Sequence, residues 1–182
     1  MNLIKTMIEG LVVLQPTVYK DNRGYFMESF HKKNIINLIG DMNFVQENES
    51  KSCRGVLRGL HFQKPPYAQS KLVRCLKGSV LDVVLDLRKD SKTYGIFQTT
   101  LLTEENKKQL FIPKGFAHGF LVLSETAIFS YKVDNYYNSE AESGVLWNDS
   151  FLNIDWIIDK NNIIVSEKDK NLPPFNKLIS PF

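Results

Sequence analysis

The stretch VLRGLHFQ, residues 56–63, places two basic side chains inside an otherwise apolar segment. Arg58 and His61 would point to opposite faces of a regular strand, because side chains alternate along it. A glycine inside a strand often marks a bulge, which re-aims one of the neighbouring side chains. With a bulge at Gly59, Arg58 and His61 would share a pocket. Without it, Arg58 is a solvated edge residue and His61 a hydrogen-bonded residue of the core.

Other polar residues that could do chemistry recur along the chain, and each also has an ordinary structural explanation. Lys71 begins an apolar segment, where lysines commonly extend to water. His118 lies between small residues and two phenylalanines, a setting typical of a structural histidine. The remaining candidates fit aromatic packing on a sheet or a solvated polar loop: Tyr131, Tyr136, Tyr137 and Asp169.

The elements that must position these residues are mostly short β-strands. Segments rich in Val, Leu, Ile and Phe recur between turn signals, which is typical of an all-β sandwich or barrel. The tripeptide Lys77-Gly78-Ser79 lies between two apolar segments and predicts a hairpin turn. Alternation along residues 80–87 predicts two faces, one with Leu81, Val83, Leu85 and Leu87 and the other with Val80, Asp82, Val84 and Asp86.

Helices are expected to be few and short. The segment HKKNIINLIG predicts a helix that ends at Gly40. A second helix is expected near SFLNIDW, residues 150–156. The last dozen residues, NLPPFNKLISPF, hold three prolines and predict an irregular tail.

Composition limits the class of protein. The chain has 182 residues, 43% of them hydrophobic, which fits a single globular domain spanning residues 1–182. A formal net charge of +3 without a basic cluster argues against a nucleic-acid binder and suits binding of a small anion. Cys53 and Cys75 lack metal-site spacing and are expected to be free thiols. No signal peptide or membrane-length apolar segment is found, so a cytoplasmic location is expected.

Seven segments, in order along nearly the whole chain, resemble the dTDP-4-dehydrorhamnose 3,5-epimerases: DNRGYFMESF, FVQENES, VLRGLHFQ, AQSKLVRCLKGSVLDVVLDLRKDSKTYG, PKGFAHGFLVL, YKVDNYYNSEAESGVLWND and SEKDKNLP. The resemblance implies an all-β, jelly-roll (cupin-like) β-barrel with a few short helices. It further implies a homodimer that exchanges strands between subunits, and neither a cofactor nor a metal.

The reaction implied by the resemblance is proton removal and return at the two carbons flanking the ketone of a dTDP-linked 4-keto-6-deoxy sugar. The carbanion delocalises onto the keto oxygen as an enolate, so the chemistry needs a base, a cationic donor at that oxygen and an acid on the opposite face. Matched motifs assign the base to His61, paired with Asp169. They place Lys71 at the oxyanion and make Tyr131 the acid. The product, dTDP-4-keto-L-rhamnose, would enter a bacterial surface glycan.

Substrate contacts are also implied by the matched motifs. Arg58 is expected to hold the diphosphate, because its fork of donors matches phosphate oxygens. Tyr137 is expected to stack on the thymine ring. Three residues are expected to reach the partner subunit's pocket: Arg23, Phe26 and Glu28. Further expected contacts are Gln46, Asn48, His118, Glu142 and Lys168.

Departures from the family pattern leave alternatives open. Asp134 stands where threonine is expected, and Leu146 where arginine is common. Neither is a core catalytic position, but the exact sugar and nucleotide stay open. A single-carbon epimerase or a 3,4-ketoisomerase would use the same side chains. A metal-dependent cupin would need two closely spaced histidines, whereas Phe62 and Gln63 follow His61. A non-catalytic sugar-nucleotide binding module is the third alternative.

Overall fold

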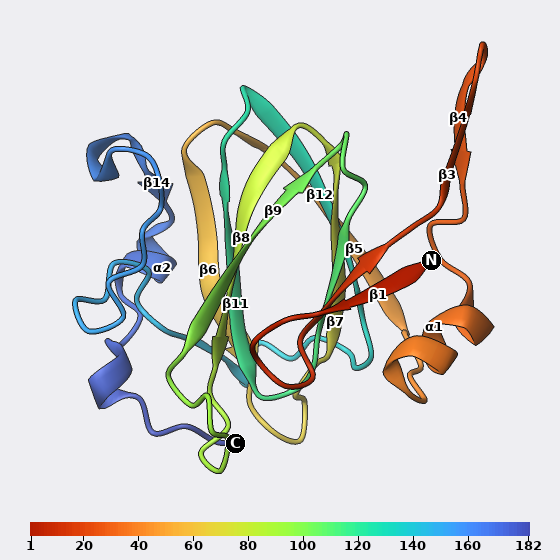
Figure 1. Ribbon diagram of the computed structural model, residues 1–182. Helices are drawn as coiled ribbons and strands as arrows, with labels where there is room; N and C mark the ends of the chain where they lie inside the picture. The colour runs from red at the N-terminus through yellow and green to blue at the C-terminus, as the bar shows by residue number, and fades with distance from the viewer.

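A computed structural model describes residues 1–182 as two packed β-sheets (Figure 1). The first six-stranded sheet has the order β1 (Asn2–Lys5), β2 (Val12–Gln15), β10 (Gln109–Ile112), β7 (Lys71–Lys77), β12 (Thr126–Val133) and β5 (Gln46–Cys53). The second has the order β13 (Glu142–Gly144), β6 (Val56–Gln63), β11 (Phe116–Val122), β8 (Ser79–Asp86) and β9 (Phe97–Thr103), with β14 (Ile164–Val165) pairing in parallel with β6.

The chain crosses repeatedly between the two sheets. Strands β5, β7, β10 and β12 belong to the first sheet, whereas β6, β8, β9 and β11 belong to the second. This back-and-forth path is that of a jelly roll, which confirms the predicted fold class. The predicted hairpin at Lys77-Gly78-Ser79 is wrong, because β7 and β8 lie in different sheets and do not pair. Gly78 instead forms a corner with φ +75°, where an added Cβ would lie 2.2 Å from the Thr126 carbonyl oxygen.

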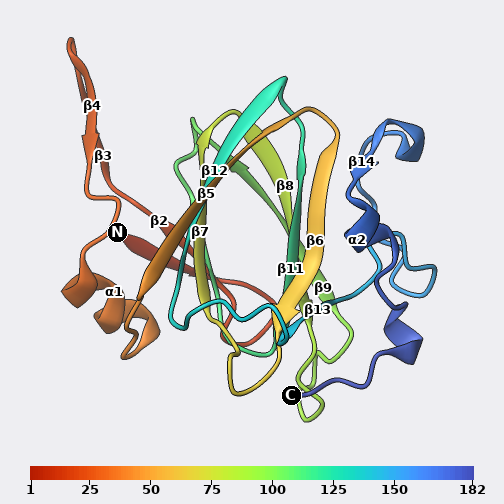
Figure 2. The same cartoon turned by 180° about the vertical axis from the view of Figure 1, so that it is seen from behind.

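The main core fills the space between the sheets. Val80 and Val84 of β8 point into it, where they meet apolar side chains of both sheets. The other face of β8 carries Leu81, Val83 and Leu85, and Leu87, directly after the strand, continues this face, as alternation predicts. These leucines and valines pack under the C-terminal segment, which covers the outside of the second sheet (Figure 2).

That C-terminal segment contains no helix at residues 150–156, so the second predicted helix is wrong. Leu152, Ile154 and Trp156 are buried at every second position, which is the period of an extended chain and not of a helix. Asp149 holds the preceding turn, since its carboxylate accepts N–H groups from Phe151 and Leu152 at 2.9 Å each. Regular structure in the rest of this segment is limited to short elements: η1 (Lys160–Asn162), β14, α2 (Glu167–Lys170) and η2 (Phe175–Lys177).

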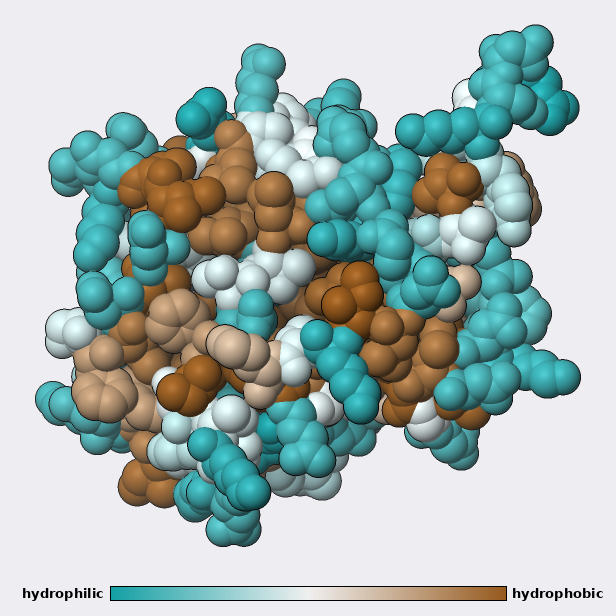
Figure 3. All heavy atoms as spheres, in the orientation of Figure 1, coloured by the Kyte–Doolittle hydropathy of each residue, from teal (hydrophilic) through white to brown (hydrophobic).

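Helix α1 (Lys32–Ile39) forms as predicted and covers the outside of the first sheet. His31 caps its N-terminus, and Gly40 ends it with φ +89°. Between β2 and α1, a hairpin of β3 (Val18–Asp21) and β4 (Gly24–Met27) projects away from the body (Figures 1 and 2). In the space-filling view this arm is mostly hydrophilic (Figure 3). No helix is long and apolar enough to cross a membrane.

Candidate active site

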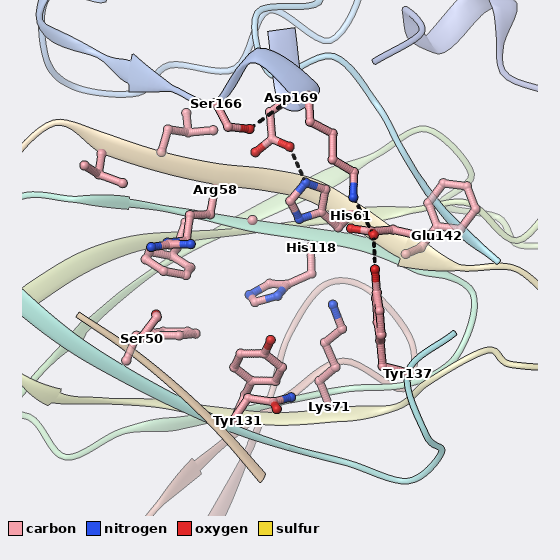
Figure 4. Close-up of a pocket in the computed structure, with 18 of the residues that line it drawn as sticks. Ser50, Arg58, His61, Lys71, His118, Tyr131, Tyr137, Glu142, Ser166 and Asp169 are labelled. Carbon is pink, nitrogen blue, oxygen red and sulfur yellow. Dashed lines mark hydrogen bonds and ion pairs between the residues drawn. The ribbon is translucent and has the colours of Figure 1, made fainter. Parts of the chain in front are cut away.

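A cavity of about 780 Å³ lies between the sheets, on the side of β5 and β6 (Figure 4). All of the residues predicted to be catalytic line it: His61, Lys71, Tyr131 and Asp169. Predicted substrate contacts line it too: Gln46, Asn48, Arg58, His118, Tyr137, Glu142 and Lys168. The tertiary structure therefore brings together residues from six strands, a loop and α2.

A bulge at Gly59 explains why Arg58 and His61 share this cavity. His118 pairs with His61 and Phe120 pairs with Arg58, so β6 has one more residue between these pairs than β11. Gly59 has φ +126°, and a Cβ there would lie 2.5 Å from the Gly119 Cα. The two glycines let the backbones of β6 and β11 approach closely while β6 bulges. Of the two alternatives that the sequence left open, the structure therefore has the bulge.

His61 is held by a buried carboxylate from the far end of the chain. Its Nε2 lies 2.7 Å from Oδ1 of Asp169. The other oxygen, Oδ2, accepts the Gly59 N–H at 3.1 Å, so one carboxylate fixes both the ring and the bulge. Ser166 caps α2 by accepting the Asp169 N–H. Burial acts to raise the Asp169 pKa. The interactions with His61, the Gly59 N–H and the Ser166 hydroxyl outweigh burial, so the pKa lies below its ordinary value.

Lys71 is the first residue of β7 and points into the cavity near His118 and Tyr131 (Figure 4). Part of its side chain is exposed to the cavity. Desolvation by the surrounding protein nevertheless lowers the Lys71 pKa to about 8, although the negative charges of Asp82 and Glu142 act to raise it. The ammonium is thus a cation with little water around it, close to the imidazoles.

A second histidine–carboxylate pair lies beside the first. His118 Nε2 is 2.8 Å from Oδ2 of Asp82, and both side chains are buried. Burial lowers the His118 pKa, which favours the neutral ring. The other oxygen of Asp82, Oδ1, has no hydrogen-bond partner. Asp82 was not among the predicted site residues, although alternation places this carboxylate on the face that carries Val80 and Val84.

Tyr131 faces His61 across the cavity (Figure 4). It lies on β12 of the first sheet, opposite Asn48 of β5, whereas His61 belongs to the second sheet. Burial raises the Tyr131 pKa, so its hydroxyl keeps its proton at neutral pH. The cavity therefore has a histidine on one wall and a protonated phenol on the other.

One end of the cavity is formed by Tyr137, Glu142 and Lys168. The Tyr137 hydroxyl donates to Oε2 of Glu142 at 2.5 Å, and the Lys168 ammonium pairs with the same oxygen. Burial acts to raise the Glu142 pKa, but these two hydrogen bonds outweigh it, so the pKa is lowered and the group is ionised. Gln46 is close by, since its Oε1 accepts the Tyr137 N–H at 3.4 Å.

Arg58 lies at the opposite end of the cavity from Tyr137 (Figure 4). Its Nε and Nη2 donate to the Ser52 hydroxyl at 3.3 and 3.2 Å. Strand β5 connects the two ends, because it runs from Gln46, beside Tyr137, to Ser52, beside Arg58. His61, Lys71 and Tyr131 lie between them. Lining residues that the sequence analysis did not select include Ser50, Gln63, Gln69 and Ser166.

Three predicted contacts lie outside this cavity. Arg23 and Phe26 are on the β3–β4 arm and Glu28 follows it, so none lines the pocket of its own chain. Phe26 is 71% exposed, and Arg23 is paired only with its neighbour Asp21. Their predicted reach into a partner's pocket stays a prediction. No three His, Cys, Asp or Glu side chains converge as a metal site would require.

Comparisons with known proteins agree with one another. The family model described as dTDP-4-dehydrorhamnose 3,5-epimerase matches residues 5–177. An Escherichia coli (strain K12) protein of that name is 49% identical over 180 residues, covering 98% of this chain and 97% of its own. The crystal structure of the Elizabethkingia anophelis protein of that name is 53% identical, with a TM-score of 0.93 and 97% of each chain covered.

A third comparison adds a bound sugar nucleotide. The Legionella pneumophila dTDP-6-deoxy-D-glucose-3,5-epimerase was crystallised in complex with dTDP-4-keto-L-rhamnose. It is 44% identical to this chain, with a TM-score of 0.93, covering 97% of this chain and 94% of its own.

Proposed function

This chain belongs to the dTDP-4-dehydrorhamnose 3,5-epimerase family, and from that premise we propose how its pocket inverts the two carbons flanking the ketone of a dTDP-linked 4-keto-6-deoxy sugar. The activity is that of an isomerase, and the product is dTDP-4-keto-L-rhamnose. The observation that carries the proposal is the placement of His61 and Tyr131 on opposite walls, with the Lys71 ammonium near them.

His61 is the base in this proposal. Because Asp169 accepts a hydrogen bond from Nε2–H, the lone pair of the neutral ring is on Nδ1, which takes the proton from the sugar carbon. The resulting imidazolium is stabilised by the ionised Asp169, as in a hydrolase triad. The hydrogen bond from Gly59 to Asp169 keeps that carboxylate in place during the transfer.

Lys71 stabilises the enolate oxygen. A carbon next to a ketone is acidic only to the extent that negative charge is accepted at the oxygen, so a cation there lowers the barrier. With a pKa of about 8, Lys71 is mostly charged at neutral pH, and its desolvated surroundings strengthen the interaction. His118, oriented by Asp82, lies beside it and supplies a further polar contact to the sugar.

Tyr131 returns a proton to the face opposite His61, which inverts the carbon. Its raised pKa keeps the hydroxyl protonated until the enolate develops. Both carbons flank one ketone, so the same base, cation and acid serve each in turn.

The order of residues along the cavity supports one orientation of the sugar nucleotide. A sugar nucleotide carries its diphosphate between the base and the sugar, and the sugar must reach His61. With thymine against Tyr137, the diphosphate would lie near Lys168, which pairs with Glu142 at that end, and Arg58 lies beyond the catalytic residues (Figure 4). We propose that Arg58 contacts oxygen atoms of the sugar in this orientation; its expected contact with the diphosphate stays a prediction. Gln46, Asn48 and Glu142 complete the nucleotide end.

The projecting arm supports a homodimer. An isolated two-stranded hairpin is marginally stable in water, and this one carries exposed Tyr19, Tyr25 and Phe26. We propose that the arm docks on a second copy, where Arg23, Phe26 and Glu28 contact the nucleotide. Residues 1–182 would act as one epimerase domain without a cofactor or metal, and a cytoplasmic location stays a prediction.

Turnover in heavy water tests the assignment. The protein is mixed with dTDP-4-keto-6-deoxyglucose, and deuterium at each sugar carbon is followed by NMR and mass spectrometry. We expect label at both carbons flanking the ketone, and none with His61→Ala, which should still bind dTDP. The control His31→Ala changes a histidine outside the cavity. Label at one carbon would indicate a single-carbon epimerase, and near-normal turnover by His61→Ala would remove His61 as the base.

A further inference from the structure

Lys71 lies at the end of a strand, so its position depends on the contacts that hold this strand end. Lys71 is the first residue of β7, directly after the connection that leads from β6 in the other sheet. It pairs with Val133, the last residue of β12, on one side and with Ile112, the last residue of β10, on the other. Strand ends are where ladders open most readily, so the position of the Lys71 side chain depends on what holds this end.

Asp134 extends the ladder by one residue beyond Val133. Its N–H donates to the Ser70 carbonyl oxygen at 3.3 Å, and its Oδ1 accepts the Ser70 N–H at 2.6 Å. Both polar backbone groups of Ser70, the residue before Lys71, are therefore bound by one residue. Next to this pair, Gln69 donates from Nε2 to the Asn135 carbonyl oxygen at 2.8 Å.

The second carboxylate oxygen of Asp134 is held from another element. Lys114, in the turn between β10 and β11, places its Nζ 3.2 Å from Oδ2. The Asp134 side chain is only 9% exposed, whereas that of Lys114 is 49% exposed. An exposed ion pair contributes little stability by itself. Here it binds the carboxylate oxygen that Ser70 does not use.

We propose that Asp134 is a positioning residue for Lys71, which fixes the backbone from which the ammonium reaches the substrate. The proposal rests on the role given to Lys71 above. The threonine of the family pattern could serve the same role, because its hydroxyl can accept the Ser70 N–H, although it cannot form the ion pair with Lys114.

Three variants test the proposal. Asp134→Ala removes the acceptor for Ser70, and we expect kcat to fall about tenfold with KM changed less than threefold, because the cation is displaced more than the nucleotide contacts. Asp134→Thr restores the acceptor and should recover most of kcat. Lys114→Met keeps the acceptor and should stay within about threefold of the unchanged protein.

A second readout reports on Lys71 directly. Competitive acetylation at several pH values, read by peptide mass spectrometry, gives the pKa of its amine without turnover. We expect that pKa to rise from about 8 in Asp134→Ala, because a loosened strand end admits water. The ionisable groups facing Lys71, namely Asp82, His118, Tyr131 and Glu142, are unchanged in all variants.

The outcomes distinguish the positioning role of Asp134 from the catalytic role of Lys71. Unchanged kcat and an unchanged Lys71 acetylation profile in Asp134→Ala would overturn the positioning role, even with a lower melting temperature. Full turnover by Lys71→Met would instead overturn the role of Lys71. Should Asp134→Ala fail to fold, Asp134→Asn and Asp134→Thr carry the test, since both retain an acceptor for Ser70. A tenfold loss in both would contradict the proposal.

Discussion

Oδ1 of Asp169 lies 2.7 Å from Nε2 of His61, although 108 residues separate the two along the chain. The contact exists because the C-terminal segment returns across the outside of the second sheet, where β14 pairs with β6 and α2 follows. The same carboxylate binds Gly59, so the base, its orienting acid and the bulge form one unit.

Asp169→Asn should lower kcat by about 10²–10⁴-fold, while dTDP binding stays within threefold. The amide no longer stabilises an imidazolium, and its NH₂ favours the wrong tautomer of His61. Steady-state kinetics and calorimetric titration with dTDP measure the two effects. Asp155→Asn, an exposed change in the same segment, serves as control. A kcat within threefold of the unchanged protein would remove Asp169 from the mechanism.

Lys71→Met should abolish measurable turnover and stabilise the fold. The Lys71 pKa is about 8 in the folded protein and about 10.5 unfolded, so the charged form destabilises the fold below pH 8, and this penalty disappears as the pH rises to about 10.5. Removing it should raise the free energy of unfolding at pH 7 by about 1–3 kcal/mol, allowing for partial exposure to the cavity. Urea unfolding at pH 7 measures this, with the exposed Lys77→Met as control. A loss of stability would contradict the desolvation argument.

The pH dependence of turnover should also report the ionisation of Lys71. As the pH rises through about 8, Lys71 of the free protein loses its proton and can no longer stabilise the enolate, so kcat/KM should fall about tenfold per pH unit on the alkaline side. Values of kcat/KM measured from pH 6 to 10 test this. A kcat/KM that stays flat to pH 10 would mean that the cation at the oxygen is another group.

Tyr131→Phe should separate proton removal from inversion. His61 and Lys71 remain, so deuterium from solvent should still exchange at the carbon facing His61, whereas net inversion should fall at least a hundredfold. NMR of the sugar products distinguishes exchange from inversion. Tyr136→Phe, which removes an exposed hydroxyl outside the cavity, should be unchanged. Inversion by Tyr131→Phe at the normal rate would show that the acid lies elsewhere.

Gly59→Ala should destabilise the protein by about 2–4 kcal/mol and reduce activity, because the added Cβ meets the Gly119 Cα at 2.5 Å and the His118 carbonyl oxygen at 2.9 Å. Gly24→Ala is the matched control. Gly24 has φ +127°, nearly that of Gly59, but nothing lies within 4 Å of its added Cβ. Thermal unfolding of both variants isolates the effect of close approach. Equal losses of stability in the two variants would show that the positive φ angle, and not the close approach of the two strands, causes the whole effect.

The sequence by itself determined the local features of this protein. Alternation along residues 80–87 gives the two faces of β8, because side-chain direction in a strand depends on position alone. The glycine in VLRGLHFQ marks the place of the bulge. Ordered motifs identified the family and its chemistry. Local pattern failed where two neighbouring strands belong to different sheets, as at Gly78, and where an extended segment is buried without pairing, as at residues 150–156.

The family resemblance predicted the pairing of Asp169 with His61, and the tertiary structure gives its geometry. Only the tertiary structure decided the order of the residues along the cavity, with Arg58 and Tyr137 at opposite ends, and the burial of Asp82 beside His118. Such contacts follow from how the two sheets and the C-terminal segment pack. Burial then sets the electrostatics, because the Lys71 pKa depends on how much water the surrounding protein excludes, and a sequence does not specify that locally.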